Sequence, residues 1–244
     1  VINIQSLRPK LLEFEYLLEK EKISVAAICE HWLKHDEMES LHYKNYHVKS
    51  HFCRSSCVNG GSMIMSEKLL DCSSINLIVN LSIECQCEIS AVRLVKVNIV
   101  LINIYRPPKG NICLMLDVLA SVFTNINTLS ENIFLVGDFN VKFNSNDPLE
   151  SRLCDLLLSY GLKPTVTFPA RLNNCLDNIF TNVNKSYYTI TKVESLSSDH
   201  CGIKLAINYP SNKNNLKCNN NNCYKISLPI NDGIKCKFTI LLTR

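Results

Sequence analysis

The sequence predicts an α/β (α+β) fold, a four-layer sandwich in which two mixed sheets pack face to face with helices outside. Three observations lead to this prediction. Apolar segments of strand length recur along the first 208 residues, three longer segments have helical apolar spacing, and long strand pairs occur beside separate helices. Two sheets covered by helices would bury the apolar faces of all these elements.

The first half of the chain contains most of the predicted strands. Residues 1–4 resemble the end of a short strand, and residues 10–22 have the apolar spacing of an amphipathic helix. An apolar strand over 25–29 stops at Glu30. Further strands are predicted at 46–52, 60–66 and 74–79, and a hairpin at 87–105, which Pro107 and Pro108 end because proline cannot donate to a ladder.

The second half contains the other two helices. Helical periodicity extends over 112–129 and 148–160, the latter with Pro148 in its first turn and Gly161 past its end. A strand over 133–136 lies between them, and three strands follow at 175–182, 187–195 and 201–209. The segment "SNKNNLKCNNNNC" is asparagine-rich and nearly free of apolar residues. We therefore predict one domain over 1–208, followed by an asparagine-rich linker and a tail outside the domain over 209–244.

Composition limits the classes of protein to which the chain can belong. The 244 residues are 46% apolar and 20% charged, which is typical of a globular domain with a full core. The run "VNIVLINIY" is about half the length of a membrane span, so no membrane partner is expected. A net charge of +4 mildly favours a polyanionic partner. The first residue is Val and no secretory signal is visible, so we expect a fragment with a slightly truncated N-terminus.

The thirteen cysteines indicate free thiols in a reducing compartment, because their number is odd and several lie within apolar runs. Cys53 and Cys57 form one close pair, and Cys85 and Cys87 form another. Neither has the second pair that a structural zinc site needs at a recognisable spacing, so zinc is not expected.

Polar side chains follow several apolar strands at the point where each strand ends. They are Asn3, Glu30, Tyr105 with Arg106, Asp138 with Asn140, Asp177 with Asn178, and Ser198 with Asp199 and His200. Each alone has a structural alternative, as a helix cap, a turn residue or a solvated carboxylate. Residues two apart on a strand face the same side, so Asp138 and Asn140 would reach one ligand if the strand stays extended.

The composition of this set is typical of a site that hydrolyses phosphodiesters. Glu30, Asp138 and Asp199 offer hard oxygen ligands, Asn3 and Asn140 offer neutral oxygens, and His200 has an unperturbed pKa near neutrality. Such a reaction needs a divalent cation, a base for water and donors to the phosphate oxygens.

Six motifs in order make the chain resemble the endonuclease/exonuclease/phosphatase family, and within it the endonuclease domain of non-LTR (LINE-type, jockey-like) retrotransposons. The motifs are "NIQSL", "ICEHWL", "YRPP", "VGDFN", "FPARLNNCLDNIFTN" and "SSDH", spread over residues 1 to about 208. The segments "LDNIFTN" and "YRPP" favour the retroelement branch over the phosphatases and sphingomyelinases of the same fold.

The resemblance implies roles for the matching residues. Glu30 would be the principal Mg²⁺ ligand, with Asn3 beside it and Asp199 as a further metal-site acid. Tyr105 would contact the scissile phosphate. Asp138 would activate the attacking water, and Asn140 would bind phosphate. His200 would stabilise the transition-state charge or act as the acid/base partner, oriented by Asp177. Arg106, Arg171, Asn178 and Ser198 would contact substrate.

The function that follows is a Mg²⁺-dependent DNA endonuclease, with Mn²⁺ as an alternative cation, that nicks target DNA and leaves a 3′ hydroxyl primer. Its expected partners are duplex DNA, the element's RNA and a reverse transcriptase domain, and it would act in the nucleus of the cell. Two alternatives stay open, because a fold does not fix a substrate. They are a phosphatase or phospholipase of the same fold, and a catalytically silent retroelement relic.

Overall fold

The computed structural model describes residues 2–143, 147–168, 175–193, 201–208 and 237–242. Its helices are α1 (Leu11–Lys20), α2 (His35–Glu39), α3 (Asn76–Val79), α4 (Ile112–Thr124) and α5 (Pro148–Ser159), with 3₁₀ turns at Arg8–Lys10, Val95–Val97 and Lys185–Tyr187. Its strands are β1 (Ile2–Asn3), β2 (Val25–Cys29), β3 (Tyr46–Phe52), β4 (Ser62–Glu67), β5 (Cys72–Ser74), β6 (Glu88–Leu94), β7 (Ile99–Tyr105), β8 (Asn132–Phe143), β9 (Lys163–Pro164), β10 (Cys175–Thr181), β11 (Tyr188–Val193), β12 (Gly202–Asn208) and β13 (Lys237–Leu242).

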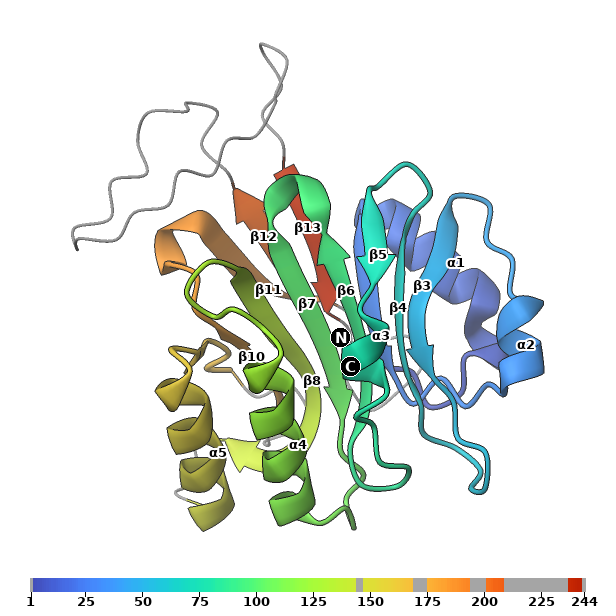
Figure 1. Ribbon diagram of the computed structural model, residues 1–244. Helices are drawn as coiled ribbons and strands as arrows, with labels where there is room; N and C mark the ends of the chain where they lie inside the picture. Colours follow the sequence, from blue (N-terminus) through green and yellow to red (C-terminus); the bar gives the residue numbers. More distant parts are fainter. Residues whose placement is uncertain (1, 144–146, 169–174, 194–200, 209–236, 243–244) are drawn as a thin grey trace.

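The strands form two mixed sheets. The first has the order β11-β12-β13-β2-β4-β3, with β1 paired to the end of β2, and the second has the order β5-β6-β7-β8-β10-β9. In the second sheet β7 and β8 are parallel, whereas β6 with β7 and β8 with β10 are antiparallel. Figure 1 shows α4 and α5 together on the outer side of the second sheet, and α1 and α2 at the opposite side of the molecule.

All five residues of β2 are buried, and successive side chains point into two different cores, which identifies the layers. Val25, Ala27 and Cys29 pack in a core shared with the second sheet and with α4 and α5. Ala26 and Ile28 point the other way, into a second core that includes residues of α1. One face of the first sheet therefore packs on the second sheet and the other on a helix, and the predicted α/β class with two mixed sheets is confirmed.

The predicted elements are mostly present, with one error of type. The segment 74–79, predicted as a strand, contains the end of β5 and the one-turn helix α3. A short apolar run cannot be assigned from its periodicity alone. The helix predicted over 112–129 ends at Thr124, and the strand predicted over 133–136 continues to Phe143. Within the described ranges, the buried cysteines Cys29, Cys53 and Cys87 are free thiols.

The strand β13 corrects the expectation that everything after residue 208 lies outside the domain. It pairs antiparallel with β12 and parallel with β2, so it occupies an interior place in the first sheet. Leu242 is opposite Ala27, and Ile2 of β1 is opposite Ile28, so β13 and β1 pair with consecutive stretches of β2. A six-residue strand cannot fold alone, but this one has a hydrogen-bonding partner on each side.

Candidate active site

A row of four polar residues crosses the second sheet in register. Glu88 on β6 is opposite Tyr105 on β7, Tyr105 is opposite Asp138 on β8, and Asp138 is opposite Asp177 on β10. All four are buried, with no more than 4% of any of them exposed. Cross-strand neighbours lie about 4.5–5.5 Å apart at Cβ and share a face of the sheet. The structure thus brings together three predicted site residues and adds Glu88.

Gly137 explains how Asp138 reaches this row. Its φ is +145°, and a Cβ added there would lie 1.9 Å from the carbonyl oxygen of Ile104 on β7. Only glycine allows the two backbones to approach so closely. Beyond Asp138 the register with β10 shifts, and Asn140 has a φ of +47°. The strand therefore does not stay extended as the sequence argument required.

A hydrogen bond within the β8 irregularity still holds Asn140 beside Asp138. The Asn140 backbone N–H donates to Asp138 Oδ1 at 3.0 Å, and its side-chain Nδ2 donates to the Arg106 carbonyl at 2.7 Å. An amide nitrogen carries two hydrogens, so one donor of Asn140 stays available.

The first sheet contributes Asn3 and Glu30. Asn3 ends β1 and Glu30 follows β2, and the Asn3 amide donates to Glu30 Oε1 and, at 3.3 Å, to Asp138 Oδ2. Trp32 Nε1 donates to the other Glu30 oxygen at 3.1 Å. Asn3 thereby links the metal-ligand candidate of one sheet to the carboxylate of the other.

Burial makes the site electrostatically unusual. Loss of solvent, and then the nearby Asp177 carboxylate, raise the pKa of Asp138 well above its usual range. Burial, followed by the charges of Glu30 and Asp138, also raises the pKa of Tyr105, which therefore keeps its proton. A cation bound beside Asp138 would lower this pKa, and the ionised carboxylate could then accept a proton.

The residues present fit a divalent cation. Asn3 Oδ1 is buried and has no hydrogen-bond partner within the ranges that the structure describes. It adjoins the carboxylates of Glu30 and Asp138, and hard oxygen donors of this kind are the ligands that Mg²⁺ takes. A bound cation would satisfy that oxygen and offset the charge of the buried acids.

Two predicted substrate contacts are corrected by the structure. The Arg106 guanidinium is buried and donates to the carbonyls of Phe139, Gly110 and Asn140 at 2.5–2.6 Å. Asn178 Oδ1 accepts from the backbone of Thr165 and Val166, because consecutive strand residues face opposite sides and Asp177 takes the inner one. Both side chains position the backbone of the site and do not face a substrate.

Sequence reasoning missed Glu88, which binds Arg54 beside the ring of Tyr105. Buried Glu88 binds Arg54 Nε at 2.5 Å and the Gly61 N–H at 2.6 Å, and the Arg54 guanidinium lies 5.9 Å from the centroid of the Tyr105 ring. The available signal was a single carboxylate inside the apolar strand "CEISAV". Arg171, Ser198, Asp199 and His200 lie outside the described residues.

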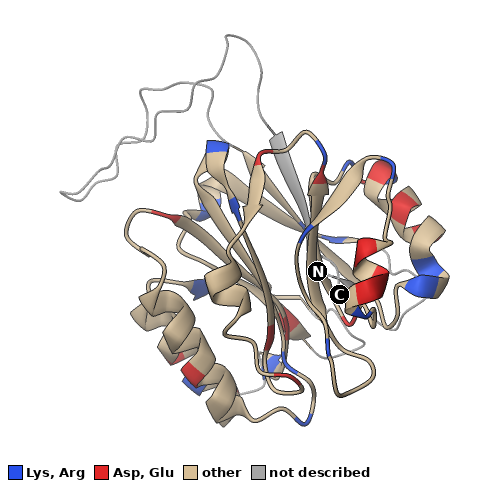
Figure 2. Ribbon diagram, turned by 45° about the vertical axis from the view of Figure 1, so that its right-hand side comes forward, with Lys and Arg blue, Asp and Glu red and all other residues tan. Residues whose placement is uncertain are grey.

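A small pocket adjoins the Glu30 side of the site. It has a volume of about 160 Å³ and is lined by Arg8, Trp32, Leu33, Lys34, Arg54, Cys57, Val58 and Asn59. Arg54 Nη2 is buried there without a hydrogen-bond partner in the described part of the chain. In the view of Figure 2, acidic and basic residues are otherwise mixed over the helices and loops.

Comparisons with known proteins identify the fold. Residues 99–204 match the model of a family described as endonuclease-reverse transcriptase. The structure is similar to the endonuclease domain of TRAS1, a telomere-specific non-LTR retrotransposon, with a TM-score of 0.67 and 18% identity over 84% of this chain and 94% of that one. The chain has the endonuclease/exonuclease/phosphatase fold. The resemblance predicted from the six motifs is thereby confirmed.

Other proteins of this fold act on nucleic acids. An AP endonuclease from Archaeoglobus fulgidus matches with a TM-score of 0.59 and 15% identity, over 82% of this chain and 95% of that one. A 3′-5′ exonuclease from Neisseria meningitidis matches with a TM-score of 0.61 and 15% identity over the same shares. No curated protein sequence matches the chain significantly. Among the described helices, none has the length and apolar character needed to span a membrane.

Proposed function

We propose that this endonuclease/exonuclease/phosphatase-fold chain is a Mg²⁺-dependent phosphodiester hydrolase that nicks one strand of duplex DNA and leaves a 3′ hydroxyl. The observation that carries the proposal is the Asn3 amide, which joins Glu30 to Asp138 across the two sheets and leaves its own oxygen without a partner. Hard oxygen ligands beside a buried, high-pKa carboxylate are the parts that metal-assisted hydrolysis needs.

Glu30 and Asn3 would hold the cation, which when bound neutralises phosphate charge, and Mn²⁺ is the alternative ion. Asp138 would accept a proton from the attacking water as the water oxygen bonds to phosphorus and the bond from phosphorus to the 3′ oxygen breaks. The proposed role of His200 is to stabilise the charge that develops, with Asp177 as its orienting acid and Asp199 as a further acid of the metal site.

Tyr105 and Asn140 would bind the scissile phosphate. Because its pKa is raised, the Tyr105 hydroxyl remains a hydrogen-bond donor at any physiological pH. The amide of Asn140 has one hydrogen committed to the Arg106 carbonyl and one to spare. Two neutral donors can hydrogen-bond the non-bridging oxygens of the phosphate, and the carboxylates are then left to bind the cation. Arg171 and Ser198 remain proposed substrate contacts.

The pocket beside Glu30 supports a polyanionic substrate. Three of its lining residues, Arg8, Lys34 and Arg54, are cationic, and of these Arg8 is paired with Glu37 and Arg54 with Glu88. Glu88 accepts from Arg54 Nε and the Val58 carbonyl accepts from Nη1 at 3.3 Å, so these contacts hold the guanidinium at the wall of the pocket. Contacts with backbone phosphates supply most of the affinity of proteins for nucleic acids.

The family match supports the proposed biological setting. A chain whose residues 99–204 match an endonuclease-reverse transcriptase family would work with a reverse transcriptase domain and the RNA of the element, and inside the nucleus, where its target lies. The nicked strand would then prime synthesis from that RNA.

The competing function is hydrolysis of a phosphomonoester or phospholipid, which the similarity to a 3′ phosphatase from Neisseria brings into consideration. We would offer one preparation three substrates in Mg²⁺: supercoiled plasmid, a 3′-phosphorylated oligonucleotide and phosphoinositide vesicles. The expected result is nicked circles, suppressed by added salt. Phosphate release with an untouched plasmid would replace the proposal with the phosphatase. A folded protein that is silent on all three would be a catalytic relic.

A further inference from the structure

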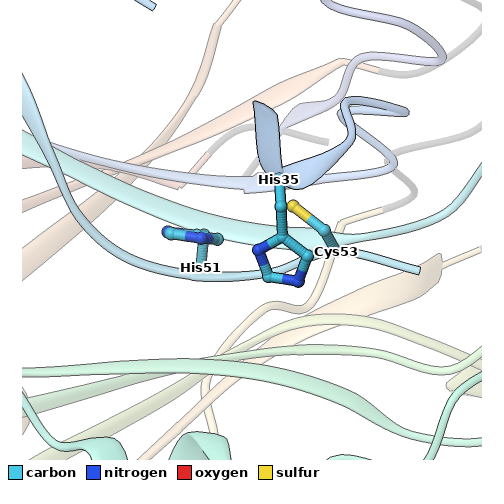
Figure 3. A group of neighbouring side chains, drawn as sticks. All are labelled: His35, His51 and Cys53. Atoms are coloured by element: carbon cyan, nitrogen blue, oxygen red, sulfur yellow. The ribbon is translucent and has the colours of Figure 1, made fainter. Parts of the chain in front are cut away.

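We propose that His35, His51 and Cys53 form a zinc site, separate from the candidate active site. Their three ligand atoms all lie within 4.8 Å of one another. The rings of His35 and His51 are in edge contact, with centroids 5.6 Å apart. In Figure 3 the side chain of His35 lies between those of His51 and Cys53. Zinc bonds of about 2.0–2.3 Å put ligands about 3.3–3.8 Å apart, so small side-chain rotations would close the site.

The backbone holds the two segments together before any metal binds. His51 lies near the end of β3, and Cys53 is the first residue after that strand. His35 is the first residue of α2. Between these segments, buried His31 bonds the Phe52 carbonyl through Nε2 at 3.0 Å and accepts from the Leu33 N–H through Nδ1 at 2.9 Å. This bridge fixes the chain before α2 against the end of β3.

The three side chains are free to bind a cation. Within the described ranges, no hydrogen bond or ion pair involves the ring nitrogens of His35 and His51 or the sulfur of Cys53. Zinc is coordinated by neutral imidazole and by thiolate, so binding at these residues would release the thiol proton of Cys53.

The donor set selects zinc over the cation of the active site. Two imidazoles and one thiolate are borderline to soft ligands, which zinc takes in tetrahedral geometry and Mg²⁺ avoids. Because His35 is exposed, the fourth position would be filled by water. The bound ion would clip α2 to β3. The sequence argued against zinc because its close cysteine pairs lack a second pair. That argument does not concern a site formed by two histidines and one cysteine.

A second cluster is a weaker candidate. Cys57, Glu84 and Cys85 also lie within 4.8 Å of one another. However, Glu84 already accepts from three backbone N–H groups and the Ser55 hydroxyl, which occupy both of its oxygens. The carboxylate therefore already serves to hold the 55–57 loop, and we assign no metal to it.

The test is a Co²⁺ titration of the reduced protein in excess Mg²⁺, which keeps the hard-ligand site filled. We expect a thiolate-to-cobalt charge-transfer band that Zn²⁺ removes by displacement. Cys53→Ser should abolish the band. His35→Ala should weaken Co²⁺ affinity by more than about 10-fold, and because His35 is exposed this change should leave the fold intact. Cys57→Ser and the exposed His47→Ala serve as matched controls that keep the band.

Three results would overturn the site: no band in the wild type under excess Co²⁺, a band that survives Cys53→Ser, or a band lost in Cys57→Ser instead. A second measurement guards against misfolded variants. Zn²⁺ should raise the melting temperature of the wild type and of His47→Ala but not that of His35→Ala. An equal rise in all three would contradict the proposal.

Discussion

Asn3 is the residue at which the two sheets meet. Its side chain is nearly fully buried, yet only its nitrogen is used, in bonds to Glu30 and Asp138. A buried amide oxygen without a partner is costly, typically about 1–3 kcal/mol. A ligand that binds Asn3 Oδ1 in the folded site would offset this cost. The acidic residues around Asn3 can then be tested one at a time.

Asp138 should make the metal-free protein less stable as pH rises. The pKa of Asp138 is raised in the folded protein, so above about pH 4 the native state keeps a proton that the unfolded chain releases. The free energy of unfolding therefore falls as the pH rises from about 4 toward the raised pKa. Asp138→Asn should therefore melt higher than the wild type at pH 7, with the difference shrinking toward pH 4. Exposed Asp117→Asn is the control. A variant that melts lower at pH 7 would contradict the raised pKa.

Arg106 should act on stability and not on substrate affinity. Lysine cannot reproduce a planar fork that serves three carbonyls, so Arg106→Lys should cost about 2–4 kcal/mol of unfolding free energy. Arg93→Lys, at a partly exposed pair with Glu131, should cost less than about 1 kcal/mol. Denaturant melts measure both. Unchanged stability with weakened DNA binding would restore Arg106 as a substrate contact.

At the scale of the element, β8 is the strand that shapes the site, and Gly137 is its critical position. Gly137→Ala would place a methyl group against the Ile104 carbonyl and should cost about 3–5 kcal/mol. Gly161→Ala is a sharp control, because Gly161 also has a positive φ of +78° but nothing lies near its added Cβ. It should cost only about 1–2 kcal/mol. Equal losses would show that backbone strain alone, and not the close approach to β7, matters.

The strand β13 gives a prediction opposite to the one that composition favours. A chain ending at residue 208 leaves β12 and β2 without the strand between them, so it should melt well below the full chain. Each 1 kcal/mol lost lowers the melting temperature by about 2–4 °C in a domain of this size. A chain ending at Leu242 is the control. If both truncations melt like the full chain, β13 contributes no stability.

The elements differ in how far the sequence could predict them. Strands that are almost entirely apolar, such as β2 and β7, were predicted closely because burial on both faces leaves a clear pattern. The helix α3 and the strand β13 could not be predicted, since a four-residue apolar run is ambiguous and β13 exists only through distant partners. The β8 irregularity at Asn140 depends on cross-strand register, which composition does not encode.

At the scale of the whole molecule, the sandwich explains why residues so far apart in sequence form one site. Asn3 and Glu30 come from one sheet, and Tyr105, Asp138 and Asp177 from the other. Their membership could be predicted from polar residues at strand ends. The roles of Arg106 and Asn178 could not, because facing direction and carbonyl partners arise only in the folded chain.

The net charge of +4 is modest. DNA would therefore be held by phosphate contacts near the site, and not by a positive potential over the whole surface. The cations around the pocket, Arg8, Lys34 and Arg54, lie beside Trp32, which itself bonds Glu30. Binding would therefore depend on a few local charges close to the metal site. Such a substrate path would place a backbone phosphate next to the carboxylates that we propose as metal ligands.

The most direct test of this account is Mg²⁺-dependent nicking of supercoiled plasmid by Glu30→Gln, with exposed Glu13→Gln as the matched control. Wild type and Glu13→Gln should produce nicked circles only with Mg²⁺, and a DNA polymerase should extend their 3′ ends. Glu30→Gln should lower the rate by at least about 100-fold with an unchanged circular dichroism spectrum, because it removes a charged metal ligand. Nicking by Glu30→Gln at the wild-type rate under limiting Mg²⁺ would contradict the account.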